Sequence, residues 1–119
     1  VISATPDNGV DLGVLLHAFS AETADGQSTA VDNAALTSNG GVATLHVTAY
    51  SGLTSVAFTV EHSSDNASFA TLGTFASVTA IGSERILVAA GTTVNRYVRA
   101  AFDVTGTGSV TFAMAFARR

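Results

Sequence analysis

The chain has 119 residues, enough for one domain with a single hydrophobic core, and it lacks cysteine, so disulfide bonds cannot hold the fold together. Only 12% of the residues are charged, against about 25% in an average soluble domain. The net charge of −4 is spread along the chain, which excludes the basic footprint of a nucleic-acid-binding protein. No apolar run approaches the roughly 18 residues of a membrane-spanning helix. We therefore expect the protein to bind neither nucleic acid nor a membrane.

The scarcity of charge poses a problem for the surface. All the basic side chains are arginines, because the chain contains no lysine. Either serine and threonine keep the surface soluble, or part of it lies against other subunits. We favour the second explanation, since large exposed apolar patches usually mark the binding site of a partner.

Residues 1–9 contain a turn at Pro6-Asp7-Asn8-Gly9 and show little periodicity, which predicts an extended N-terminal arm ahead of a domain formed by residues 10–119. Residues 10–19 are apolar and are expected to form a strand. Residues 20–41 are polar and rich in turn residues, with short strands expected around residues 27–31.

Alternation of apolar and polar residues dominates the rest of the chain, and it is the signature of strands that are buried on one face. Residues 42–50, 54–61, 93–102 and 109–119 all show this pattern. The side chains expected to point inward are Leu45, Val47, Ala49, Val56, Phe58, Val60, Val110, Phe112, Met114 and Phe116. In the closing strand the opposite face carries only threonine and alanine, which suits close approach of a neighbour.

Seven to nine short strands, with turn residues every 8–12 positions and no amphipathic helix, predict an all-β fold. We expect a single β-sandwich. Periodicity does not separate a jelly roll from an immunoglobulin-like connection. The jelly roll is favoured, because the chain has neither the cysteine pair nor the core tryptophan of an antibody-type domain.

Arg96 and Arg99 are an odd number of positions apart in one predicted strand, so they point to opposite faces. One of them is therefore expected near the core side or at a strand end, where it can pair with a carboxylate such as Glu61 or Glu84. The alternative is that one arginine lines a subunit interface, where arginine is enriched.

No motif predicts catalysis, a metal centre or a cofactor. His17, His46 and His62 do not have the short spacing of metal ligands, and no serine lies in a nucleophile elbow. The aspartates near predicted loops favour turn formation over a calcium site. We therefore expect a protein that is not an enzyme and that holds no metal or cofactor.

Four segments do resemble a known group of proteins. They are residues 62–72 (HSSDNASFATL), residues 83–86 (SERI), residues 94–99 (VNRYVR) and residues 111–118 (TFAMAFAR). Together they resemble small virion structural proteins of tailed bacteriophages, in which a turn like that at residues 62–69 precedes strands like those at residues 94–99 and 111–118. The resemblance covers roughly residues 38–119, and its motifs are strands and turns.

The resemblance implies a structural component of the phage particle, located in the virion. The first expectation is a decoration protein on the outer capsid surface, which binds the major capsid protein as a homotrimer and stabilises the capsid. The second expectation is a place in the tail tube or tip. The residues expected at interfaces are Val1, Ile2, Pro6, Arg96, Arg99, Phe116 and Arg118.

A carbohydrate-binding module is the alternative from another functional class, because jelly rolls often bind sugars. Such sites use exposed aromatic platforms beside polar groups. The chain has no tryptophan, and only Tyr50 and Tyr97 combine a ring with a polar tip. This shortage makes the virion interpretation the preferred one.

Overall fold

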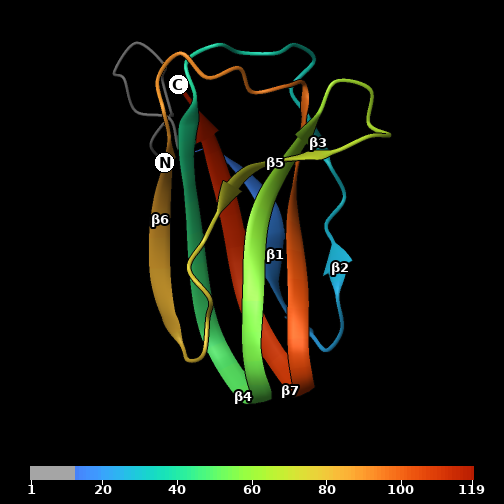
Figure 1. Ribbon diagram of the computed structural model, residues 1–119, viewed down its shortest axis with the longest axis vertical. Helices are drawn as coiled ribbons and strands as arrows, with labels where there is room; N and C mark the ends of the chain where they lie inside the picture. Colours follow the sequence, from blue (N-terminus) through green and yellow to red (C-terminus); the bar gives the residue numbers. More distant parts are fainter. Residues whose placement is uncertain (1–12) are drawn as a thin grey trace, which may run out of the picture.

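The computed structural model describes residues 13–119, and this part of the chain is built from strands without a helix (Figure 1). The strands are β1 (Val14–Glu22), β2 (Gly26–Gln27), β3 (Val31–Asp32), β4 (Gly41–Ser63), β5 (Ala70–Thr74), β6 (Gly82–Val88) and β7 (Tyr97–Arg118). All the pairings between them are antiparallel. The expected all-β class is therefore confirmed.

The two long strands β4 and β7 pair along almost their whole length and form the centre of the sheet. One half of this pair, residues 41–51 with 109–118, is flanked by β6 and β1, and we call it the β6 layer. The other half, residues 53–63 with 97–106, is flanked by β5 and by the short strands β2 and β3, and we call it the β5 layer.

The sheet folds over on itself, so that the two layers face each other. Ten residues of straight strand would span about 33 Å. The rings of Phe102 and Phe112, both on β7, nevertheless lie only 5.3 Å apart. The ring of Phe58 on β4 lies 4.6 Å from that of Phe112. Figure 1 shows both long strands turning at the lower end of the molecule.

The bend is made at glycines that keep the ladder continuous. Gly52 has φ +79° and Gly106 has φ +98°, a left-handed region that other residues avoid. The pairing register shifts on both sides of Leu53, next to these glycines. Such shifts increase local strand twist and bending, so β4 and β7 turn a corner without ending.

The hydrophobic core lies between the two layers. Its largest fully buried side chains include Phe58, Phe112, Phe116, Leu45 and Met114. The inward positions expected from alternation are buried, because antiparallel strands with one face on a core place alternate residues inside. Ala49 is the exception and is exposed, since the pairing register of β4 shifts between Val47 and Ala49. The aromatic rings at the centre meet edge to face, which adds to the free energy gained by burying their area.

Several sequence expectations need correction or lie outside the described residues. The strands are not all short, because residues 42–50 and 54–61 belong to one bent strand, as do residues 97–102 and 109–118. The glycines between them look like strand ends in the sequence. The first described strand begins at Val14, and the expected arm at residues 1–9 is not described. The single β-sandwich and its jelly-roll connectivity stay predictions, because the described strands belong to one antiparallel sheet.

We predict that Gly52→Ala destabilises the fold more than Gly91→Ala. Both glycines have positive φ, so each alanine costs about 1 kcal/mol of backbone strain. A Cβ at Gly52 would also lie 2.6 Å from the carbonyl oxygen of Thr107, whereas one at Gly91 meets nothing within 4 Å. Urea unfolding should show a loss of about 2–3 kcal/mol at Gly52. If both variants lost the same free energy of unfolding, the conclusion that the bend at Gly52 is tightly packed would be wrong.

Candidate interaction surfaces

The structure distributes the expected interface residues over very different environments. Val1, Ile2 and Pro6 lie outside the described residues. Phe116 is only 1% exposed and packs in the core between the layers, so its ring is not presented at the surface. Arg96, Arg99 and Arg118 all bind groups within the chain itself. These arginines therefore stabilise local structure in the chain as it stands.

Arg96 is an exposed side chain that joins two distant segments. Its Nε and Nη2 donate to the two carboxylate oxygens of Asp32 at 2.6 and 2.9 Å, a bidentate pair. The hydrogen bond from Arg96 lowers the pKa of Asp32 to about 2, with help from the N–H of Ala34. The same pairing raises the pKa of Arg96. The contact fastens β3 beside the beginning of β7.

Arg99 binds Glu61 across the central strand pair, as the sequence suggested for one of the two arginines. Its Nε donates to Oε1 of Glu61 at 2.7 Å, and the two residues lie directly opposite each other. The guanidinium carbon also lies 3.7 Å from the centroid of the Phe69 ring. Both charges are half-buried, and the cation–π contact holds the turn after β4 against the sheet.

Arg118, the last residue of β7, binds Thr37 and the backbone carbonyls of the segment that leads into β7. Its Nη1 donates to Thr37 Oγ1 and to the carbonyl of Val94, both at 3.0 Å. Its Nη2 donates to the carbonyls of Asn95 at 2.7 Å and Arg96 at 3.1 Å. Burial lowers the pKa of this guanidinium. One side chain thus adds a charged donor to the carbonyls of Val94 and Arg96, which also accept from the N–H groups of Thr37 and Asn33, and it binds the carbonyl of Asn95 as well.

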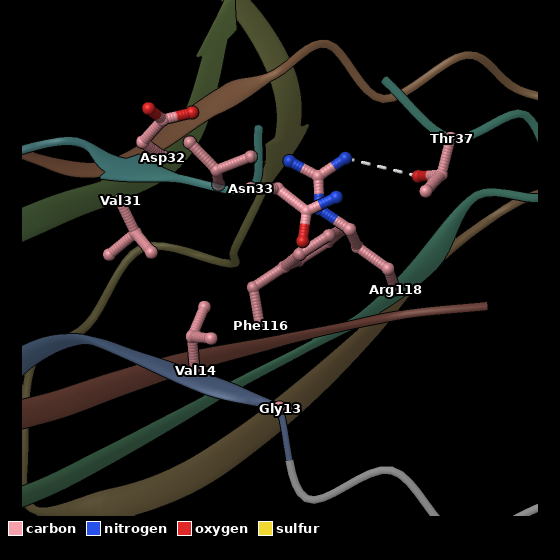
Figure 2. A pocket seen from close by; sticks show the side chains of 9 residues that line it. Gly13, Val14, Val31, Asp32, Asn33, Thr37, Phe116 and Arg118 are labelled. Carbon is pink, nitrogen blue, oxygen red and sulfur yellow. Dashed lines mark hydrogen bonds between the residues drawn. The ribbon is translucent and has the colours of Figure 1, made fainter. Parts of the chain in front are cut away.

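Beside Arg118 lies a pocket with a cavity volume of about 310 Å³. Figure 2 shows the side chains of Val14, Val31 and Phe116 converging on it from different strands, with the Arg118 guanidinium above them. Gly13, where the described chain begins, also lines it. Its charged groups are already occupied, because Asp32 binds Arg96 and Arg118 binds carbonyls. The pocket offers mainly an apolar floor.

A cluster of His17, Ser20 and Glu22 on β1 was not foreseen from the sequence. Nε2 of His17 lies 2.8 Å from Glu22 Oε2 and 3.5 Å from Ser20 Oγ, and Nδ1 lies 3.1 Å from the carbonyl oxygen of Phe112. In a hydrolytic triad the acid and the nucleophile bind different ring nitrogens. Here both approach the same nitrogen, so the cluster cannot act as such a relay in this arrangement.

The physical role of this histidine is to hold β1 against the sheet. Its ring is buried and stacks on Phe112 at 3.9 Å between centroids, and it meets Phe102 edge to face at 5.7 Å. A pattern in the sequence that could have indicated this is the polar residue at an inward position of an apolar strand.

The remaining polar candidates do not assemble into a reactive centre. Among residues 13–119 no three histidines or carboxylates lie close enough to hold a metal ion. His62 accepts a hydrogen bond from the N–H of Asn95 at 3.0 Å, and burial together with the charge of Arg118 lowers its pKa. The same described residues contain no helix that is long and apolar enough to cross a membrane.

Tyr50 lacks the open geometry of a sugar-binding platform. Its hydroxyl donates to the carbonyl of Leu53 at 3.0 Å, and its ring is half-buried against the core. Tyr97 is also half-buried, with the Arg96 guanidinium 5.0 Å from its ring centroid. Neither ring supplies the exposed face that stacking on a sugar requires, so the structure adds no support to the carbohydrate alternative.

The exposed large apolar side chains are concentrated along the edges of the β6 layer. Val14, Leu15 and Phe19 project from β1, Leu87 projects from β6, and Ile81 directly precedes β6. The outer face between these two edges carries the alanines of β7, among them Ala115 and Ala117, beside Val42 and Thr44 of β4. This surface has the apolar character that the low charge of the chain suggested.

We predict that Arg118→Ala destabilises the protein by about 2–3 kcal/mol, because four acceptors lose a charged donor. The matched control is Arg119→Ala, whose side chain is exposed and makes no hydrogen bond or ion pair with the described residues. That change should cost less than about 0.5 kcal/mol. Unfolding in urea measures both, and similar small losses would contradict the role of Arg118 as a clamp.

We further predict an acid-dependent loss of stability from Asp65. The N–H groups of Ser68 and Ala67 and the hydroxyl of Ser63 donate to this carboxylate and lower its pKa from 3.8 to about 2. Because the folded pKa is the lower one, the contribution is complete above about pH 4 and is lost as the pH falls toward about 2.

Unfolding free energies of the wild type and of Asp65→Asn, measured across this pH range, test the expectation. The variant should be less stable at neutral pH and should lose less stability in acid. Asp103→Asn, at an exposed carboxylate without a hydrogen bond to the described residues, serves as the control for a general charge effect. A variant with the full acid dependence of the wild type would refute the assignment to Asp65.

No protein-family model matches the chain, and no curated protein matches it in sequence. The resemblance to phage virion proteins therefore stays a prediction, which rests on residues 62–72, 83–86, 94–99 and 111–118. In the structure these segments form the end of β4 with the turn into β5, part of β6, the beginning of β7 and the closing part of β7.

Proposed function

We propose that the chain is a structural protein of a tailed-bacteriophage particle, and that it decorates the outer surface of the capsid by binding the major capsid protein. The observation that carries the proposal is the row of exposed apolar side chains on β1 and beside and along β6, which needs partners to cover it. The low charge and the four phage-like segments agree with the same assignment.

The mechanism would be that of a cement between capsid subunits. The folded sheet would supply a stable body, since buried residues from both layers form one core cluster. The surface contacts of this body and of residues 1–9 would bridge neighbouring capsid proteins and oppose the outward pressure of the packaged DNA. Such binding needs no reactive group. It is also compatible with arginines that bind groups within the chain. A place in the tail tube or tip is the second candidate.

We predict that the protein lacking residues 1–9 attaches more weakly to capsids and unfolds at the same urea concentration as the whole chain. The measurement is co-sedimentation of purified protein with capsids of the phage that encodes it, stripped of their outer proteins, and in parallel with isolated tails. Full attachment of the truncated protein would overturn the role of the arm. Binding to tails without binding to capsids would replace decoration with the tail assignment.

A further inference from the structure

The free edge of β6 differs from the other edges of the sheet. Within residues 13–119, the only strand that pairs with β6 in the sheet is β4. It does so in an unbroken register from Gly82 opposite Val47 to Val88 opposite Gly41. Its other side therefore presents a straight row of backbone donors and acceptors that no described residue pairs in the sheet.

The other edges carry features that hinder the addition of another strand. The pairing of β1 shifts register between Leu15 and His17 and again between His17 and Ser20. β5 has five residues and a register shift, and β2 and β3 have two residues each. Natural sheets use such irregular or short edges, together with lysine and proline, to prevent unwanted pairing. β6 is regular and has neither lysine nor proline, and its charged side chains are Arg85 and Glu84, of which Glu84 points inward to the N–H of Ala76.

We propose that two copies of this chain pair through β6, edge to edge and antiparallel, so that the β6 layers of both join into one continuous sheet. This inference goes beyond the proposed function and does not rest on it. The occupant is a second copy because β6 is the one described edge that is both regular and long enough to match itself, and because one register of this self-pairing places no like charges directly opposite each other.

The register of this pairing follows from which way the side chains point. Residues directly opposite each other in an antiparallel pair share a face of the sheet. Ser83, Arg85 and Leu87 are exposed on the outer face, whereas Glu84 and Ile86 are half-buried on the inner one. The inner face is fixed by contacts, because the Glu84 carboxylate accepts from the N–H of Ala76 at 2.8 Å. The two-fold axis must therefore lie midway between one residue of β6 and the same residue of the second copy.

The charges select the residue at the axis. An axis at Glu84 or Arg85 would set two like charges directly opposite each other, which destabilises a strand pair. An axis at Ile86 places Arg85 opposite the partner's Leu87 and pairs residues 84–88 of each strand. An axis nearer either end of β6 would pair shorter stretches. Leu87 is 64% exposed in the single chain, and this arrangement covers it with the stem of an arginine.

Charge substitutions at Leu87 test this geometry directly. Leu87→Lys would set a lysine opposite Arg85 twice in each dimer, and we expect the dimer dissociation constant to rise about tenfold. Leu87→Glu would create two ion pairs, so we expect dimerisation to be kept or strengthened. In the double variant Arg85→Glu with Leu87→Lys, the new glutamate lies opposite the new lysine of the second copy. Ion pairs of opposite polarity then form, and the affinity should return to about that of the wild type.

The matched control is Leu36→Lys, because Leu36 is 58% exposed and lies in the loop before β4. Sedimentation equilibrium over a range of concentrations measures the mass and the dissociation constant of each variant, and thermal unfolding confirms that each is folded. A dimer with the stated order of affinities supports the pairing. A wild-type monomer or trimer at high concentration overturns it. A dimer whose dissociation constant is the same in Leu87→Lys and Leu87→Glu as in the wild type overturns it as well.

The result is separable from the capsid experiment. The trimer implied by the resemblance has half again the mass of the two-fold pair, so sedimentation distinguishes them without a capsid. Loss of dimerisation in Leu87→Lys with full binding to capsids would leave the proposed function standing. Dimerisation with the expected charge pattern but no binding to capsids or tails would remove the proposed function and leave the β6 pairing in place.

Discussion

The structure depends on one constraint, the bend that turns the β4–β7 pair back upon itself. Without it the two strands would form a long two-stranded ribbon, which could not bury its apolar face. With it, the ring of Phe112 packs against Phe58 and Phe102, and the two layers close on a common core. These aromatic contacts contribute to the stability of the fold, since truncation of a buried ring to alanine typically costs about 3–5 kcal/mol.

The sequence predicts the burial of side chains better than it predicts the topology of the strands. Alternation identified which residues point inward, because a strand with one face on a core has a strict period of two. It could not show that Gly52 lies within a strand, since a glycine between two alternating runs looks the same whether the ladder stops or bends there. The pairing of β7 with β4 and with β1 is equally invisible, because periodicity carries no information on register.

The candidate site residues show a similar division. An ion pair between Arg99 and Glu61 could be anticipated, because both lie on alternating strands at positions that leave one arginine near the core. The clamp made by Arg118 could not, since its acceptors lie at Thr37 and at residues 94–96, far away in the chain. A terminal pair of arginines in a sequence suggests a solvated end. Only the folded arrangement brings the loop carbonyls within reach of one of them.

The way in which the charges are used connects the fold to assembly. Asp32, Glu61 and Asp65 are occupied by an arginine, another arginine and backbone N–H groups, so they stabilise the chain internally and add little repulsion between copies. On β6 the only outward charge is Arg85, and the neighbouring Glu84 turns inward to a backbone N–H. A protein that must avoid association would place charge along its most regular edge. Here the charges hold loops and distant strands together, while the regular edge keeps an exposed leucine, as expected for a surface that is covered in the working protein.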